Sequence, residues 1–144
     1  MNLKNYTSTV PPERTAARIE DRLRLFGATS VSKEYSGGKI AALTFRLVVD
    51  ERPINVRLPI DVQAAKKVMQ ENRRRYTSNL EDQAERTAWR LMQDWVEIQL
   101  ALIQLHQAEP LEVFLSYAWD GKTSFYNHLQ ANHFKALPLP EDGK

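Results

Sequence analysis

The side chains with the greatest potential for chemistry are few in this sequence, and their spacing fits no common site. The chain has no cysteine and only three histidines. His128 and His133 stand five residues apart, whereas a zinc-binding pair on a helix stands four apart and shares one face. The run Ser36-Gly37-Gly38-Lys39 has no upstream glycine and no following helix, so it indicates a hairpin turn, not a phosphate-binding loop. We therefore expect no catalytic residue, no metal ligand and no cofactor, and we expect the protein not to be an enzyme.

Basic side chains offer a different chemistry, which is the binding of phosphate groups. The candidate nucleic-acid-binding residues are Arg46, Arg57, Lys66, Lys67, Arg73, Arg74, Arg75 and Tyr76. Their guanidinium and ammonium groups can neutralise phosphates, and the tyrosine ring can stack on an unpaired base. The alternative is that the run 73–75 is a solvated helix end, which the helix dipole favours by itself. The pattern does not distinguish DNA from RNA.

The charge of the chain is unevenly distributed, although its net value is only +2. Residues 1–30, 31–56, 57–90 and 91–144 carry net charges of +2, +1, +3 and −4, which add up to that value. A basic region followed by an acidic one gives the molecule an electrical polarity. The basic region is therefore where we expect a polyanion to bind.

The periodicity of apolar residues predicts a helix, three strands and a second helix between residues 12 and 74. Two prolines open the first helix, and Gly27 ends it. Alternation then predicts strands on either side of Gly37-Gly38 and a third strand over 54–58, which places Arg46 and Arg57 on the non-core face. Asp61 is a predicted N-cap for the second helix. This order predicts an α+β fold, an antiparallel three-stranded sheet covered by the two helices.

A long helix is predicted from about Leu80 to Ala108, and it is apolar around most of its circumference. Its main seam is spaced like a heptad repeat and comprises Ala84, Ala88, Leu91, Trp95, Ile98, Leu102 and Leu105. A second stripe with Trp89 and Met92 lies beside the seam. We expect the excess apolar surface to be covered by the C-terminal segment or by a second copy of the chain, with Trp89, Trp95, Leu102 and Trp119 as the candidate self-association or partner residues.

The C-terminal region is predicted to be helical. Pro110 either kinks the long helix or begins a new one. Thr123 and Ser124 are candidate caps for a short helix from Phe125 to about Phe134, which we expect to return Phe125, Leu129 and Phe134 to the core. The predicted organisation is a flexible arm over 1–10, a single α+β domain over 11–136 and a flexible tail over 137–144.

Several stretches of the sequence resemble a group of uncharacterised tailed-phage and prophage proteins. These stretches are EYSGGKIAALTFRL (34–47), RTAWR (86–90), DWVE (94–97), EVFL (112–115) and DGKT (120–123). The similarity lies in core and turn positions, so it implies a shared fold and a phage setting and carries over no catalytic residue. Small phage proteins of this kind commonly serve DNA metabolism or disarm host defences.

Two functions follow as hypotheses. The first is a phage accessory protein that binds nucleic acid through its basic sheet and helix surface. The alternative is an inhibitor of a host defence complex such as CRISPR, for which Tyr117, Trp119, Phe125 and Tyr126 are a candidate protein-binding face. No apolar run reaches the roughly 18 residues that span a bilayer, and residues 1–5 show no signal-peptide pattern. We therefore expect the cytoplasm of the bacterial host as the location and no membrane partner.

Overall fold

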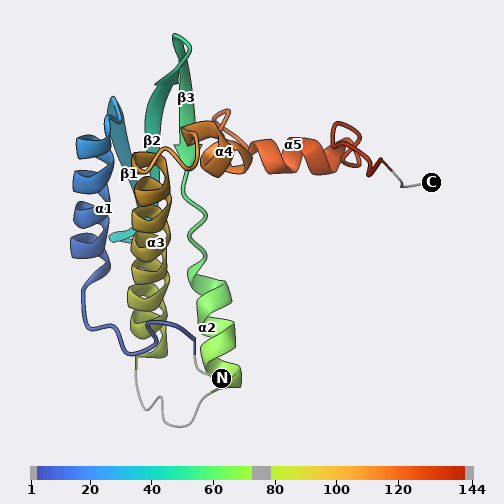
Figure 1. Cartoon of the computed structure of the whole chain (residues 1–144). Helices are drawn as coiled ribbons and strands as arrows, with labels where there is room; N and C mark the ends of the chain where they lie inside the picture. Colours follow the sequence, from blue (N-terminus) through green and yellow to red (C-terminus); the bar gives the residue numbers. More distant parts are fainter. Residues whose placement is uncertain (1–2, 73–78, 142–144) are drawn as a thin grey trace.

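A computed structural model describes residues 3–72 and 79–141, and Figure 1 shows how their elements are arranged. In chain order the elements are α1 (Pro12–Phe26), β1 (Ser30–Ser36), β2 (Lys39–Val49), β3 (Arg52–Arg57), α2 (Val62–Glu71), α3 (Leu80–Gln104), α4 (Pro110–Phe114), the 3-10 helix η1 (Leu115–Tyr117) and α5 (Phe125–Ala131). The predicted α+β fold is confirmed. None of the described helices combines the length and the apolar composition that a bilayer crossing requires.

The sheet is antiparallel with the strand order β1-β2-β3. Gly37 and Gly38 have φ angles of 59° and 79°, the positive values that a tight hairpin turn requires and that glycine adopts without strain. Phe45 on β2 pairs with Val31 on β1 and with Val56 on β3. Because side chains alternate along a strand, this register places the three apolar residues on one face of the sheet.

The inner face of the sheet is covered by α1 and α3, which lie side by side (Figure 1). Buried side chains from the sheet and from both helices form the main core, namely Ala16, Ile19, Leu23, Ile40, Leu43, Phe45, Leu47, Val56, Leu58, Trp89, Met92, Val96 and Phe114. Phe45 meets Phe114 edge to face, with ring centroids 5.3 Å apart. The packing of helix and sheet around one core therefore involves elements far apart in the sequence.

The expectation that the second helix covers the sheet is wrong. Helix α2 packs instead against the first half of α3, where Ala65 and Met69 join Ala84 and Ala88 in a separate cluster. Its N-cap is the predicted one, because the Asp61 side chain accepts a hydrogen bond from the Ala64 backbone N–H at 3.0 Å. Ala65 and Met69 are its only buried residues, whereas α1 and α3 contribute the larger side chains that cover the sheet.

The predicted seam of α3 is only partly buried. Ala84 and Ala88 are in a core cluster, but Ile98 is 58% exposed and Leu105 is 70% exposed. The neighbouring stripe with Trp89 and Met92 faces the main core instead. A seam repeated every seven residues drifts by about 20° per heptad around a straight α-helix, so it cannot face one side along the whole length. The helix also ends at Gln104, earlier than predicted.

The segment before α1 lies against α3. Thr87 donates its hydroxyl to the Asn5 carbonyl at 2.9 Å, and Gln83 and Arg86 both donate to the Ser8 carbonyl, at 3.0 and 3.1 Å. The Asp94 side chain accepts a hydrogen bond from the side-chain amide of Asn5 at 2.9 Å. The sequence predicted a flexible arm over 1–10, and it gave no sign of these contacts between backbone carbonyls and the polar side of α3.

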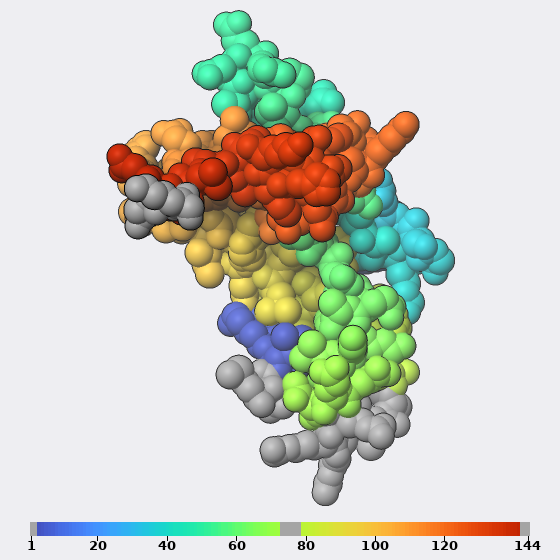
Figure 2. Space-filling model, turned by 90° about the vertical axis from the view of Figure 1, so that its right-hand side faces the viewer, coloured from blue at the N-terminus to red at the C-terminus, as the bar shows by residue number. Residues whose placement is uncertain are grey.

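Pro110 begins a new helix, α4, and at its start the Glu112 Oε1 atom accepts a hydrogen bond from the Glu109 backbone N–H at 2.9 Å. Ser124 caps α5 as predicted by accepting from the Asn127 N–H at 3.2 Å. The expected return of α5 to the core is wrong, since this helix buries none of its residues. It extends sideways from the body of the molecule (Figure 1), and Figure 2 shows the C-terminal segment crossing between α2 and the tip of the sheet.

Candidate nucleic-acid interface

The outer face of the sheet brings two of the predicted arginines together. Arg46 on β2 pairs with Asn55 on β3, and Arg57 on β3 pairs with Thr44 on β2. All four side chains therefore lie on the same face, opposite Phe45 and Val56. The Arg46 Nε atom donates to the Asn55 Oδ1 atom at 2.9 Å. This contact orients the guanidinium and leaves its four terminal N–H donors available.

Arg57 is held between an acid and an aromatic ring. Its Nη2 atom donates to the Glu34 Oε2 atom at 2.9 Å, and its guanidinium carbon lies 4.7 Å from the ring centroid of Trp119. The hydrogen bond from Arg57 and the charge of that residue lower the pKa of Glu34. Glu34 accepts from one of the five N–H donors of Arg57, so the guanidinium is oriented and still able to bind a phosphate.

Trp119 reaches Arg57 because the C-terminal segment joins the edge of β3. Ala118 forms an antiparallel bridge with Val56, and the Trp119 N–H donates to the Asn55 carbonyl at 2.8 Å. A second bridge joins Trp119 to Ser124 just before α5. Backbone hydrogen bonds on both sides therefore fix the position of the indole beside the sheet.

A turn stabilised by Asp120 follows Trp119. The Asp120 Oδ1 atom accepts from the backbone N–H groups of Lys122 and Thr123, both at 2.8 Å, and its Oδ2 atom lies 2.7 Å from the His128 Nε2 atom. The hydrogen bond from the Thr123 backbone, followed by those from His128 and Lys122, lowers the pKa of Asp120 to about 2. The carboxylate therefore stays ionised at neutral pH and holds the turn that follows Trp119.

A groove of about 610 Å³ lies between the end of β3 and the C-terminal segment. We call it the aromatic groove, because Tyr117, Trp119 and Tyr126 line it together with Arg57, Leu58, Pro59, Ile60, Ser116 and Ser124. A smaller groove of about 200 Å³ shares Trp119 but contains Asp120 and His128. The aromatic groove thus combines aromatic rings with one cation, whereas its neighbour contains a carboxylate.

The other predicted nucleic-acid residues are not part of this surface. Lys66 forms an ion pair with Glu81 at 2.9 Å, which ties it to α3, while Lys67 is exposed on α2. The predicted run Arg73, Arg74, Arg75 and Tyr76 lies outside the described residues. The structure therefore brings Arg46 and Arg57 onto one face, and it gives Lys66 a separate acidic neighbour.

The candidate self-association or partner residues lie in different environments. Trp89 is fully buried in the main core, so it presents no surface to a partner. Trp95 is partly buried between Phe114 and Tyr117, with ring centroids 5.8 and 5.5 Å away. Leu102 is partly buried, and Trp119 lines the aromatic groove. Sequence reasoning assigned Trp119 to a protein partner and missed its contact with Arg57, because no local pattern indicates the bridge between Val56 and Ala118.

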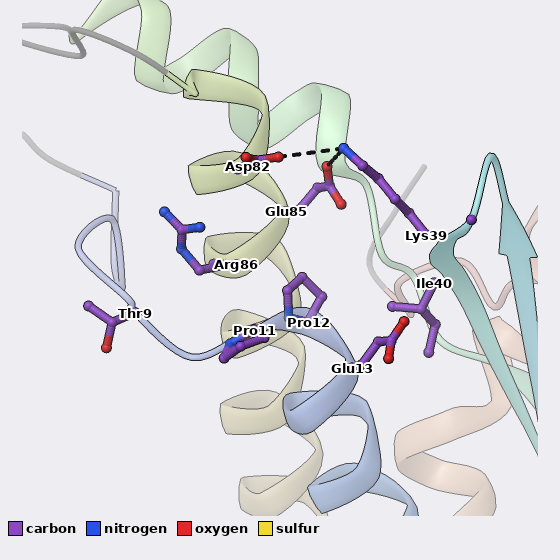
Figure 3. A pocket seen from close by; sticks show the side chains of 10 residues that line it. Thr9, Pro11, Pro12, Glu13, Lys39, Ile40, Asp82, Glu85 and Arg86 are labelled. Carbon is purple, nitrogen blue, oxygen red and sulfur yellow. Dashed lines mark hydrogen bonds and ion pairs between the residues drawn. The ribbon is translucent and has the colours of Figure 1, made fainter.

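A separate hollow, drawn in Figure 3, lies between the start of α1, the β1–β2 hairpin and α3. Lys39 donates to the Glu85 Oε1 atom at 2.8 Å and lies 3.5 Å from the Asp82 Oδ1 atom. The hydrogen bond to Glu85 raises the pKa of Lys39, which favours the protonated amine. The cluster joins the hairpin to α3. Across residues 3–72 and 79–141, no group of three or more histidine and carboxylate side chains is placed to hold a metal ion.

No protein-family model matches this chain, and no match was found among curated proteins or solved structures. The chemistry of the interface is therefore inferred from its own residues. Two oriented guanidiniums, a fixed indole and a groove lined by tyrosines can bind phosphate and an aromatic base together.

Proposed function

We propose that this chain is a non-enzymatic phage accessory protein that binds nucleic acid, with the phosphates lying on the outer face of β2 and β3. The observation that carries the proposal is the contact of Arg57 with Trp119 on the same face as Arg46. Both guanidiniums are oriented by a single neighbouring oxygen and keep several N–H donors. The proposal places the protein in the cytoplasm of a bacterial host, and the phage setting rests on the resemblance of its core and turn sequences.

Electrostatic binding of this kind is tested by its salt dependence. The affinity for fluorescent single-stranded DNA and RNA is measured by anisotropy over a range of salt concentrations. Each neutralised phosphate of a single strand contributes about 0.7 to the slope of log K against log salt. The double variant Arg46→Gln/Arg57→Gln is expected to bind more weakly, with a slope shallower by about 1.4, because two phosphate contacts are lost.

The matched control is Arg14→Gln/Arg18→Gln, which removes the same charge from exposed positions of α1. This helix covers the inner face, so the control is expected to keep most of the affinity. Equal losses in the two double variants would show that only net charge matters. A wild-type affinity in the millimolar range, or one that salt does not change, would end the proposal.

A protein partner is the second candidate, and exposed apolar side chains favour it. Ile98 and Leu105 are exposed at the end of α3, and Leu139 is 84% exposed beyond α5. One such partner is a second copy of the chain, for which light scattering would give a mass above the 16.6 kDa of the monomer. Another is a host defence complex such as CRISPR, whose subunits would then be recovered with the protein from host lysate even after nuclease treatment.

A further inference from the structure

We propose that the aromatic groove accepts one unpaired base of the strand whose phosphate binds Arg57, so that the protein selects single-stranded over double-stranded nucleic acid. The inference rests on the proposed function and adds the strandedness of the ligand. It follows from the position of the groove, which begins at Arg57 and continues along the tyrosines of the C-terminal segment.

The size and lining of the groove suit a base with its sugar. Its volume of about 610 Å³ lies within the range of small-ligand sites. Tyr117 is fixed by its edge-to-face contact with Trp95 at 5.5 Å, whereas Tyr126 is 47% exposed and accessible to a ligand. Stacking on such rings tolerates any base, because every base has a π face.

The charges around the groove favour a base that carries a phosphate. Of the described residues that line the aromatic groove, Arg57 is the one that carries a charge, and this charge is positive. The smaller groove that shares Trp119 contains Asp120, whose carboxylate repels phosphate. A strand that crosses the outer face of the sheet is therefore directed towards the tyrosines and away from Asp120.

A base inside a duplex is stacked and paired, and removing it from the stack costs free energy. A single strand enters the groove without that cost. The structure therefore favours single strands through Tyr126 and Trp119, while Arg46 and Arg57 attract both kinds of nucleic acid.

The test compares oligonucleotide single strands, the corresponding duplexes and a nucleoside monophosphate. We expect single strands to bind at least about tenfold more tightly than duplexes. The Tyr126→Ala variant is expected to weaken single-strand binding by about 5- to 150-fold and to leave duplex binding unchanged. The control Tyr35→Ala removes a tyrosine that is 57% exposed on β1, and it is expected to change neither affinity.

Tryptophan fluorescence gives a second readout that does not depend on the Tyr126 variant. Trp89 is buried and Trp95 is partly buried against the main core, so the part of the quenching that is lost in Trp119→Phe reports on Trp119. Single strands are expected to quench the wild type, and the Trp119→Phe variant is expected to lose that quenching and keep an aromatic ring beside Arg57. A nucleoside monophosphate is expected to quench weakly, because it lacks the contacts along the sheet.

The outcomes separate the two proposals. If single strands and duplexes bind equally and Arg46→Gln/Arg57→Gln still weakens both, the groove proposal fails while the proposed function stands. If a nucleoside monophosphate binds as tightly as a strand, the groove is a mononucleotide site and the strand proposal is overturned. If no polynucleotide shows salt-dependent binding that requires Arg46 and Arg57, the proposed function itself fails.

Discussion

The two faces of the sheet are built from the same strands and have opposite properties. On β2, Phe45 is 1% exposed and contacts Phe114 in the main core, whereas the next residue, Arg46, is exposed and bonded to Asn55. On β3, Val56 is fully buried and Arg57 lies beside Trp119. Alternation along a strand thus separates the residues that stabilise the fold from those available to a ligand.

This difference shows why substitutions at neighbouring positions are informative. A substitution on the inner face acts on the folding equilibrium, because the side chain has no access to a ligand. A substitution on the outer face acts on binding, because little apolar surface is buried there.

Phe45→Ala is expected to lower the free energy of unfolding by about 3–5 kcal/mol, because it leaves a cavity beside Phe114. Urea denaturation followed by circular dichroism measures this loss. The neighbouring Arg46→Ala variant is expected to change stability by less than about 0.5 kcal/mol. If the two variants destabilise equally, the two faces do not have the separate roles described above.

Arg57→Gln is expected to weaken single-strand binding about tenfold, or by about 1.4 kcal/mol. The variant loses the phosphate contact and the cation–π contact with Trp119. Glu34→Gln tests the same site with the opposite sign, since it removes the negative charge next to Arg57 and is expected to raise the affinity at low salt. An increase in affinity for Arg57→Gln, or a tenfold loss for Glu34→Gln, would contradict the assignment.

The turn after Trp119 is expected to weaken in acid. Since the pKa of Asp120 is about 2, below its ordinary value of 3.8, the ionised carboxylate favours the folded turn. Its contribution is complete above about pH 4 and is lost as the pH falls through about 2. Amide NMR signals of Lys122 and Thr123 should follow this titration, and Asp120→Asn should abolish it. A midpoint near 3.8 would show that the hydrogen bonds are absent in solution.

Lys66→Gln is expected to change the affinity by less than about twofold, because the charge of Lys66 is already paired with that of Glu81. The anisotropy measurement used for Arg57→Gln applies here. A loss as large as that of Arg57→Gln would extend the interface from the sheet to α2 and remove the contrast between the two groups of cations.

Much of the local structure could be predicted from the sequence. The hairpin follows from Gly37-Gly38, the start of α2 from Asp61 and the cap of α5 from Ser124, since turns and caps depend on neighbouring residues. Alternation also predicted the shared face of Arg46 and Arg57. The shared face of the two arginines follows from the two-residue period of a β-strand alone.

The remaining features depend on contacts between distant segments. The sequence pattern did not show that α3 replaces α2 as the cover of the sheet, because amphipathicity gives a buried face but not its partner. The seam of α3 was misjudged because its spacing drifts around the helix, which leaves Ile98 exposed. Trp119 was missed as part of the interface because the bridge of Ala118 to Val56 has no local signal.

The most direct test of the account is an NMR titration of the protein with a short single strand. If the strand lies on the outer face, the side-chain signals of Arg46 and Arg57 and the indole signal of Trp119 will shift together at equimolar ligand. The exposed residues Arg14 and Arg18 of α1, on the opposite side of the sheet, will remain unchanged. Shifts confined to α1 or α2, with Trp119 unaffected, would contradict the central claim.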